Sequence, residues 1–558
     1  MFPIGVQDFS QLLEGDQILL FALISITNAL FLFFASMKFI LVLQQCSYRP
    51  KRYFEWINSK TNPYMSRLML LCMLALLFFC VLNMTFIQML GQNVGSYLGF
   101  ASYIMFSMLY IKSESSINAK VPLRKTARII RLSITYIILL IAINFGLIIL
   151  FTYLAYIIQS EVFAILRFAF LCVLPILIPF ILFLAYCINE PLESSIRKEY
   201  IRQAIEKLNK SSVIKIGITG SFAKTSVKEI LKTILSQKYR VLATPSSFNT
   251  PLGISKTVQN LDSTHDVFIA EMGARQKGDI KELAKIVRPK YGILTGVNNQ
   301  HLQTFGKIET TMDTKFELFE NLEEGGVAIF SSDNDNSKLL FDKYKGEKYL
   351  AGQSDDNNLV KATDIVMDAR GTTFNLIIGD NEPMKCSTVL LGSHSVSNIC
   401  LASAMAYKLG LTPKEIAVGI GRLQSIGHRL ELLPNNKNII IIDDSYNSNE
   451  AGIDAAISVL DNFKGRKIVL TPGLIELGKV ENLVNYKFGK KLATHADLVF
   501  VIGRHNAEML IKGLLDGGMD RNNVKSAKSL NKGNAMLNEI LQEGDIVLFE
   551  NDLPDNYN

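Results

Sequence analysis

Residues Gly217-Ile-Thr-Gly-Ser-Phe-Ala-Lys-Thr-Ser226 decide the fold of the chain that follows them. They come after an apolar run, Val213 to Ile218, and before a helical pattern, Val227 to Ser236. A strand, a turn of small residues, Lys-Thr and a helix predict a phosphate-binding loop, because backbone N–H groups and the helix N-terminus face the anion. Lys224 would add a point charge, and a hydroxyl such as that of Thr225 can ligate Mg²⁺. The stretch therefore predicts a nucleotide-binding α/β domain.

Downstream of this loop, apolar runs alternate with helical patterns. Such alternation predicts a mostly parallel sheet with helices on both faces. The expected strands are 240–244, 267–271, 291–297 and 327–330 in a first unit, and 439–443, 467–471, 498–503 and 545–549 in a second. Residues 360–390 are expected to form paired strands, because Gly371 and Gly379 supply turns.

Three polar residues stand at or beyond the ends of these strands, where ligands bind in such sheets. Glu271 ends one apolar run, and its carboxylate could reach a nucleotide-bound Mg²⁺, since Mg²⁺ prefers oxygen ligands. His301 follows the 291–297 run, and Lys315 lies on the helical pattern beyond it. Taken singly, a strand-end glutamate is often only solvated and a helix lysine is usually a surface residue. The order and spacing of the set carry the prediction.

The part of the chain before Asn189 has a different composition. The 558 residues are too many for one domain, and nearly all long apolar runs lie in this first part. A bilayer core needs about 20 apolar residues as helix. Five stretches qualify: 17–40, 66–90, 96–112, 132–157 and 162–188. Residues 1–189 are expected to form an all-α membrane domain, and the charged residues 190–212 a linker helix.

The loops between these stretches alternate in charge. Basic residues crowd two of them: Lys38, Arg49, Lys51, Arg52, Lys60 and Arg67 after the first stretch, and Lys112, Lys120, Arg124, Lys125, Arg128 and Arg131 after the third. The loops at 91–95 and 159–161 contain no Lys or Arg. The positive-inside rule then predicts a multi-pass protein of the cytoplasmic membrane, with its N-terminus outside and the chain after Ile188 in the cytoplasm.

Composition also excludes some partners. The net charge of +7 is modest for this length and lies largely in these loops, so nucleic acid is not expected as a partner. The seven cysteines show no paired spacing, which indicates neither a disulfide framework nor a zinc site. Acidic residues near the N-terminus replace the basic region of a cleavable signal peptide.

Several further motifs, in a fixed order, give the second part of the chain a family resemblance. After 217–226 come Ser-Phe-Asn-Thr-Pro-Leu-Gly (247–253), Glu-Met-Gly-Ala (271–274), His301-Leu302, Lys315, Gly-Ser-His-Ser-Val-Ser-Asn (392–398), His-Arg-Leu-Glu-Leu-Leu (428–433) and Asp-Asp-Ser-Tyr-Asn-Ser-Asn (443–449). Together these residues resemble the Mur ligase family over about 213–550. The resemblance implies a central ATPase domain, 213–427, and a C-terminal Rossmann-like domain, 428–558, that close on each other.

The resemblance also implies an activity and a set of site residues. The family uses ATP and Mg²⁺ to activate a carboxylate as an acyl phosphate, which an amine then attacks to form an amide. The residues that the motifs assign to ATP are Gly220, Ser221, Ala223, Lys224, Thr225, Ser226, Asn398, Arg429 and Asp444, with Asp443 as an alternative to Asp444. Those assigned to metals are Thr225, Glu271, His301 and Lys315, the last being the lysine that is carbamylated in the family. Lys224, His301 and Lys315 are the expected catalytic residues.

Three departures from the family pattern qualify these expectations. Ala223 stands where the family has glycine, and alanine is strained there by about 1 kcal/mol if the position needs a positive φ. Gly296 stands where asparagine is usual, so Asn298 or Asn299 would have to compensate. A membrane domain occupies the place of the family's UDP-sugar-binding domain, which favours a lipid-linked sugar or a growing polymer as the acceptor.

Three functions follow from this combination. The leading hypothesis is a membrane-anchored, ATP-dependent amide ligase of cell-envelope or surface-polymer assembly, which joins an amino acid or other amine to a carboxylate. The second is a non-catalytic, regulatory ATP-binding membrane protein, which the departures at Ala223 and Gly296 favour. An ATP-driven transporter ranks last, because five spans leave little room for a pathway and the chain has one nucleotide signature.

Overall fold

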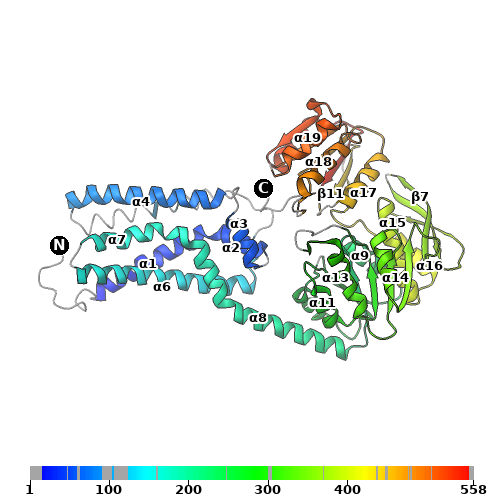
Figure 1. Ribbon diagram of the computed structural model, residues 1–558, viewed down its shortest axis with the longest axis horizontal. Coiled ribbons are helices and arrows are strands. Elements are labelled where there is room, and N and C mark those ends of the chain that lie inside the picture. The colour runs from blue at the N-terminus through cyan, green and yellow to red at the C-terminus, as the bar shows by residue number, and fades with distance from the viewer. Residues whose placement is uncertain are drawn as a thin grey trace. The chain divides into compact units, whose positions relative to one another are not determined.

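The computed structural model describes residues 15–46, 48–58, 63–90, 104, 105, 108, 123–158, 161–246, 248–298, 305–368, 370–434, 438–446, 450–475, 477, 480–503 and 505–551. The chain divides into two compact units, Met1–Ile196 and Arg197–Asn558 (Figure 1). Each unit is described by itself.

The described residues of the first unit are almost entirely helical. Its helices are α1 (Gly15–Ala35), α2 (Met37–Gln45), α3 (Pro50–Ile57), α4 (Pro63–Leu90), α6 (Ala127–Ile158), α7 (Glu161–Val173), the 3-10 turn η2 (Leu174–Leu177) and α8 (Ile178–Lys210), which continues into the second unit. Leu32, Phe39, Tyr136 and Leu182 belong to one buried apolar cluster that joins α1, α2, α6 and α8. The expected all-α character of this part of the chain agrees with the described helices.

The expectation of five spans was wrong for the described residues, where three helices are long and apolar enough to cross a membrane. These are Ile18–Ala35, Ala127–Ile158 and Ala169–Lys210. The stretch 66–90 lies in helix α4, of which Met65–Leu74 qualifies only as a shorter apolar helix. The stretch 96–112 lies almost wholly outside the described residues.

The last expected span, 162–188, overlaps the third candidate span, Ala169–Lys210, and contains a short 3-10 turn. Helix α7 ends at Val173 and α8 begins at Ile178, with Pro175 in the 3-10 turn between them. Proline has no N–H to donate and clashes with the preceding turn, which accounts for a break here. Helix α8 then runs through Pro191 to Lys210, so the predicted linker helix is a continuation of the helix before it.

The first half of the second unit is built on a nine-stranded sheet in the order β2-β3-β1-β4-β5-β6-β7-β8-β9. Its strands are β1 (Ile214–Thr219), β2 (Val241–Ala243), β3 (Val267–Glu271), β4 (Tyr291–Leu294), β5 (Val327–Ser331), β6 (Glu347–Gly352), β7 (Val360–Asp368), β8 (Gly371–Ile378) and β9 (Met384–Thr388). In this spatial order, all neighbouring strands from β2 to β7, including β1, pair in parallel. Strand β8 pairs antiparallel with both β7 and β9. The expected parallel sheet and the paired strands at 360–390 are therefore confirmed.

Helices cover both faces of this sheet (Figure 1). One buried cluster joins the sheet to α9 (Lys224–Leu235), α15 (Ser393–Lys408) and α16 (Pro413–Gly421). A second cluster, on other side chains of the same strands, joins it to α10 (Pro251–Val258), α11 (Asp279–Val287), α13 (Ile308–Glu320) and α14 (Asp335–Lys343). Successive strand residues point to opposite faces, so each parallel strand is apolar on both sides.

The second half of this unit is a smaller α/β layer structure, with a six-stranded sheet in the order β10-β11-β15-β12-β13-β14. Its elements are β10 (Glu431–Leu433), β11 (Ile440–Asp444), α17 (Glu450–Asp461), β12 (Lys467–Thr471), α18 (Glu481–Leu492), β13 (Leu498–Ile502), α19 (Ala507–Asp516), the 3-10 turn η4 (Arg521–Asn523), β14 (Val524–Ala527), α20 (Leu530–Asn538) and β15 (Ile546–Glu550). All neighbouring strands pair in parallel except β10 and β11. The four strands expected here are confirmed, whereas β10 and β14 were not expected.

Candidate nucleotide and metal site

The loop between β1 and α9 is held against the neighbouring strands. Strand β1 pairs in parallel with β3 on one side and β4 on the other, so the carboxyl ends of all three meet at one edge. Gly220 has φ +152°, and a Cβ on it would lie 2.0 Å from the Thr295 side-chain oxygen. The Ser221 N–H donates to the Gly296 carbonyl at 2.8 Å. Only glycine fits at position 220, which is the close backbone approach that a phosphate cradle requires.

Ala223 ends this loop as the N-cap of α9, with φ +57° and ψ +1°. Position 223 therefore has the positive φ on which the expected strain depended. It takes the left-handed conformation, where alanine is strained. Lys224, Thr225 and Ser226 follow as the first turn of α9, whose free N–H groups carry a partial positive charge. The Lys224 ammonium donates to the Gly220 carbonyl at 2.8 Å and to the Ser221 carbonyl at 3.3 Å. Burial lowers the Lys224 pKa, and the Glu271 carboxylate opposes that change.

Glu271, at the end of β3, accepts hydrogen bonds at both carboxylate oxygens. Thr225 Oγ1 donates to Oε2 at 2.9 Å, and Asn249 Nδ2 donates to Oε1 at 3.1 Å. Lys228 Nζ lies 3.4 Å from Oε2. The predicted pair of oxygen ligands, Thr225 and Glu271, is thus in direct contact.

The nearby Phe222 ring accounts for a glycine at position 296. Gly296 has φ +150°, and a Cβ on it would lie 2.5 Å from the Phe222 ring. An asparagine therefore does not fit here beside Phe222. The Asn298 backbone N–H donates to Ser221 Oγ at 3.3 Å, which ties the segment to the phosphate loop by another route. Asn299 and His301 lie outside the described residues.

Lys315 lies on α13 with its side chain 2% exposed. Burial lowers the pKa of Lys315 well below its usual value, and the Lys224 charge adds to this effect, while Asp279 and Glu317 oppose it. Those two carboxylates are engaged elsewhere: Asp279 accepts from the Arg275 N–H at 2.8 Å, and Glu317 accepts from the Gly278 N–H at 2.8 Å. No ion pair of Lys315 occurs among the described residues. The neutral amine is therefore favoured.

The other residues assigned to ATP lie on α15 and in the smaller layer structure. Asn398 is 7% exposed on α15. Arg429 lies between His428 (φ +61°) and Leu430 (φ +48°), and its guanidinium stacks 4.6 Å from the Tyr446 ring centre. Burial raises the pKa of Asp444 to about 6, and Arg429 opposes that shift.

The two neighbouring aspartates have different partners. Asp444 Oδ1 accepts from the Leu430 N–H at 3.3 Å, whereas Asp443 Oδ2 lies 2.7 Å from His428 Nδ1. Asp443 also accepts from the Ser445 N–H at 3.0 Å. The Arg429 charge lowers the pKa of Asp444 against the effect of burial.

A nucleotide and Mg²⁺ fit these residues. The glycine cradle, the start of α9 and Lys224 suit phosphate, while Thr225 and Glu271 offer oxygen ligands. Mg²⁺ is commonly held by one or two carboxylates together with substrate phosphates and water, so a large protein ligand set is not required. Accordingly, the described residues hold no group of three or more His, Cys, Asp or Glu that could bind a metal.

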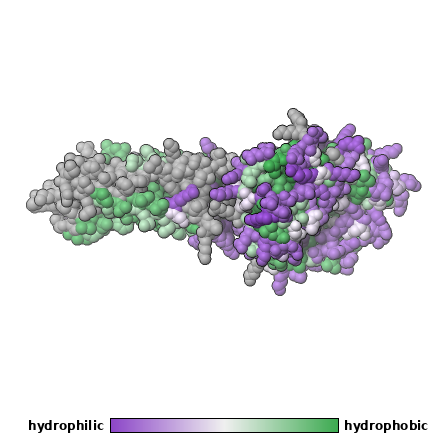
Figure 2. All heavy atoms as spheres, turned by 90° about the horizontal axis from the view of Figure 1, so that it is seen from above, coloured by the Kyte–Doolittle hydropathy of each residue, from purple (hydrophilic) through white to green (hydrophobic). Residues whose placement is uncertain are grey.

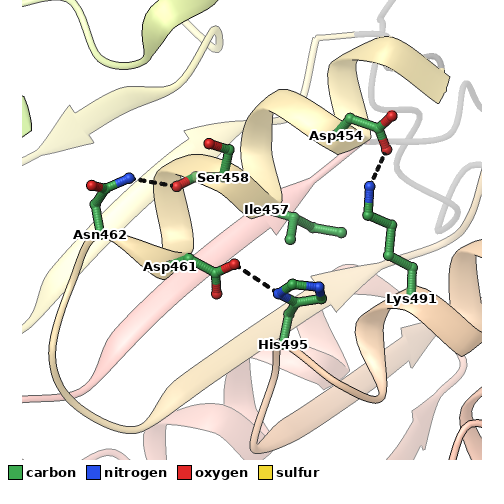
Figure 3. Close-up of a pocket in the computed structure, with 7 residues that line it drawn as sticks. All are labelled: Asp454, Ile457, Ser458, Asp461, Asn462, Lys491 and His495. Atoms are coloured by element: carbon green, nitrogen blue, oxygen red, sulfur yellow. Dashed lines mark hydrogen bonds and ion pairs between the residues drawn. The ribbon is translucent and has the colours of Figure 1, made fainter. Parts of the chain in front are cut away.

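Two hollows lie in the smaller layer structure. One is lined by Asp454, Ile457, Ser458, Asp461, Asn462, Lys491 and His495, on α17, α18 and the segments that follow them (Figure 3). Its charges are paired with each other, Lys491 with Asp454 at 2.5 Å and His495 with Asp461 at 2.7 Å. It contains none of the predicted site residues. The other is lined by residues at the strand ends, among them His428, Asp443, Pro472 and Asn551.

By the family resemblance, residues 471–478 correspond to a loop near the incoming amine, with Gly473 and Glu476 as candidate residues and a turn without a ligand as the alternative. Gly473 has φ +82°, and its carbonyl accepts from Asn551 Nδ2 at 2.6 Å. Glu476 lies outside the described residues.

Sequence reasoning missed two residues that contact Glu271. Asn249 was quoted within a motif but given no role. Lys228 was not singled out, although it is a lysine on the apolar face of α9, among Val227, Ile230 and Leu231, and is 0% exposed. A charged residue inside an otherwise apolar helical stripe was the available signal.

Comparisons with known proteins agree with this architecture. A curated relative, UDP-N-acetylmuramoyl-tripeptide–D-alanyl-D-alanine ligase of Buchnera aphidicola subsp. Baizongia pistaciae, is 30% identical over 53% of this chain. The match spans 64% of that relative's length, less than two thirds of it. MurF from Acinetobacter baumannii has the same fold, with a TM-score of 0.59 at 24% identity over 65% of this chain and 78% of that one. MurF from Thermotoga maritima, solved in complex with ADP, gives 0.57 at 24% identity over 64% and 80%.

Two family models match consecutive parts of the chain. Residues 218–406 match the Mur ligase middle domain, and residues 428–550 match the Mur ligase, glutamate ligase domain. The first covers the nine-stranded sheet with the phosphate loop, and the second covers the smaller layer structure with Arg429 and Asp444. Because the two matches together take up more than half of its residues, the chain belongs to the Mur ligase family.

Proposed function

We propose that this protein is a membrane-anchored, ATP-dependent amide ligase of cell-envelope assembly. Mur ligases form amide bonds at the expense of ATP with Mg²⁺, and relatives of this chain are named as ligases. The observation that carries the proposal is the contact between Thr225, at the start of α9, and Glu271, at the end of β3. The contact brings two side-chain oxygens together beside the phosphate loop and Lys224, which supports a Mg²⁺ site there.

The chemistry follows from the difficulty of attacking a carboxylate. An ionised acid is a poor electrophile, and transfer of a phosphoryl group from ATP to it supplies a leaving group that an amine can displace. Lys224 and the start of α9 would offset charge on the transferred group, in the way that preorganised donors stabilise developing charge. Mg²⁺, when bound by Thr225 and Glu271, would supply further positive charge at the phosphates.

Lys315 would take part as a modified side chain. Its lowered pKa favours the neutral amine, which is the form that can attack CO₂. Attack forms the N–C bond of a carbamate and releases one proton, which turns a buried amine into an anionic oxygen ligand. Support for this role is the burial of Lys315 together with the engagement of its nearest carboxylates elsewhere.

Membrane attachment is supported by the surface of the first unit. Large apolar side chains such as Leu23, Leu30, Ile134 and Ile138 are exposed on α1 and α6. Figure 2 shows the described atoms of this unit as mainly hydrophobic and those of the second unit as mainly hydrophilic. We place Arg124, Arg128 and Arg131, at the start of α6, on the cytoplasmic side with the catalytic domains. A reporter fused after Asn189 should read cytoplasmic, and one inserted at 159–161, between the last two candidate spans, should read external; the reverse pattern contradicts this topology.

The acceptor is proposed to be a carboxylate on a lipid-linked sugar or growing polymer. The support is the membrane unit that precedes the family matches, which begin at residue 218. The names of the relatives instead specify a UDP-sugar peptide. Purified full-length protein should release ADP when offered membrane-extracted envelope lipids with an amino-acid pool. Stimulation by soluble UDP-muramoyl peptide alone would assign the acceptor of the relatives.

The same assay tests whether the protein turns over at all. Substrate-stimulated ADP release should be abolished in Lys224→Ala, because this variant lacks the phosphate-facing ammonium. Absence of stimulation by every pool, with ADP still bound, would favour the non-catalytic alternative. The specific observation behind that alternative is the strained Ala223 beside the loop.

A further inference from the structure

Lys228 is a fully buried cation next to the proposed metal site. Its side chain is 0% exposed, and its ammonium contacts the Ser246 carbonyl, Glu229 Oε1 at 3.3 Å and Glu271 Oε2 at 3.4 Å. Long charged side chains are almost never fully buried unless paired, because removing a charge from water costs several kcal/mol in proteins. A site that keeps such a lysine must compensate its charge, and Glu271 does so.

The ion pair between Lys228 and Glu271 stabilises the charge of both buried side chains. Glu271 is 1% exposed, so its carboxylate also lacks solvent to stabilise a charge. Thr225 and Asn249, which carry no charge, donate hydrogen bonds to this carboxylate. Among the described residues, Lys228 is the cation that forms an ion pair with it within 4.0 Å. Without Lys228, the buried carboxylate would keep its two neutral hydrogen-bond donors but would have no ion pair within 4.0 Å among the described residues.

The geometry also links three segments of the chain. Thr225 and Lys228 are three residues apart on α9, so both reach the same face of the helix. Ser246 has φ +47°, and Lys228 holds its carbonyl in that unusual conformation. Asn249, three residues further on, then meets the second oxygen of Glu271. One ammonium therefore connects helix α9, strand β3 and the loop that carries Asn249.

We propose that Lys228 is a positioning residue of the metal site, which fixes the Glu271 carboxylate and the Ser246–Asn249 loop for a divalent cation on the bound nucleotide. The inference rests on the proposed function, since it presumes that a nucleotide and Mg²⁺ bind at the phosphate loop. Partners that orient metal ligands typically matter 10–100-fold for metal affinity. Among the described residues, Lys228 donates no hydrogen bond to the phosphate-loop backbone or to Lys224, so its loss should weaken Mg²⁺ binding and leave nucleotide binding unchanged.

The test uses full-length protein in detergent, with ADP and Mg²⁺ as the probes. Calorimetric titration gives ADP affinity in EDTA, and then the Mg²⁺ concentration that half-saturates the ADP-bound protein. Lys228→Met should raise that Mg²⁺ concentration about 10–100-fold while ADP affinity in EDTA stays within about twofold. Lys232→Met, one turn further along α9 at an exposed position, is the matched control and should behave as wild type.

Three results would decide against the inference or its foundation. An unchanged Mg²⁺ requirement in Lys228→Met overturns the role of Lys228. Equal losses with and without Mg²⁺ also overturn it, because they indicate general damage. Wild-type protein that binds no ADP in either condition overturns the proposed function itself, which separates the two failures.

A second variant covers the case in which Lys228→Met does not fold. Lys228→Met combined with Glu271→Gln leaves no unpaired buried charge in the cluster, because the remaining carboxylate, Glu229, is 36% exposed to solvent. Recovery of a folded chain in this double variant supports the pairing, because coupled residues give non-additive effects. Failure of the double variant to fold, beside a folded Glu271→Gln, overturns it.

Discussion

Two helices of the middle domain, α9 and α13, each bury a lysine, and the two lysines are in opposite situations. Lys228 on α9 contacts Glu271, Glu229 and the Ser246 carbonyl. Lys315 on α13 has no ion pair among the described residues, and burial lowers its pKa well below the usual value. Burial alone therefore does not make a lysine reactive. The counter-charge decides whether the amine remains a cation that positions others or becomes a neutral nucleophile.

The largest expected effect comes from a third lysine, Lys224 in the first turn of α9. Lys224→Met should reduce substrate-stimulated ADP release by about 10²–10³-fold, because a preorganised charge at the transferred phosphoryl is lost. The rate of ADP release under saturating substrates measures it. The fold-loss of ADP release in Lys224→Met is the reference with which the losses in the Lys228 and Lys315 variants are compared. Retention of more than a tenth of the wild-type rate would remove Lys224 from the site.

Substitution of Lys315 tests directly whether Lys315 and Lys228 have different roles. Lys315→Ala should lose about 100-fold in the same assay, and acetate or propionate should restore part of it by supplying the missing carboxylate. Lys315→Arg keeps a cation but cannot form a carbamate, so it should be as inactive as Lys315→Ala. Lys228→Met should gain nothing from either acid. Rescue of both variants, or of neither, would break the distinction between the two lysines.

The sequence was sufficient for most of the site's scaffold but not for this contrast. The Gly217–Ser226 loop and the apolar runs on either side predict β1, α9 and the parallel sheet, because local pattern and phosphate geometry agree there. The place of Lys228 in the apolar stripe of α9 was the available signal, but its partners, Glu271 and the Ser246 carbonyl, lie far along the chain and are known only from the structure. Short β6, β10 and β14 were missed because their pairing depends on neighbours distant in sequence.

The membrane part shows a second limit. Hydropathy predicts where apolar helices lie, yet it predicted one span over 162–188 where the chain has α7, a 3-10 turn at Pro175 and α8. The signal for the break was present in Pro175 and Pro179, but averaging over a window hides two residues. Position-specific features of this kind need separate inspection.

A smaller effect is expected at Gly296, on which the shape of the loop before α9 depends. In Gly296→Ala the new Cβ would come 2.5 Å from the Phe222 ring, so overpacking should cost about 1–3 kcal/mol. The thermal midpoint of the full chain with ADP measures the loss. Phe222→Ala in the same chain should recover part of it, while the strain of φ +150° remains. Gly421→Ala, where a Cβ meets open space, is the control. No recovery in the double variant would show that backbone strain, and not the ring, excludes side chains at 296.

The smallest effect, and the only expected gain, concerns Ala223. At φ +57° an L-residue costs about 1–2 kcal/mol, whereas glycine adopts this conformation freely but gives up about 0.5–1 kcal/mol of chain entropy on folding. Ala223→Gly should therefore stabilise the loop by up to about 1 kcal/mol, or about 2–4 °C in the ADP-bound thermal midpoint. Because the backbone keeps its conformation, the Thr225–Glu271 contact and the roles of Lys228 and Lys315 should be unchanged. A large rise in ADP release in this variant would mean that alanine holds the loop away from its active geometry, and the wild-type chain would then be closer to the regulatory alternative than to an efficient ligase.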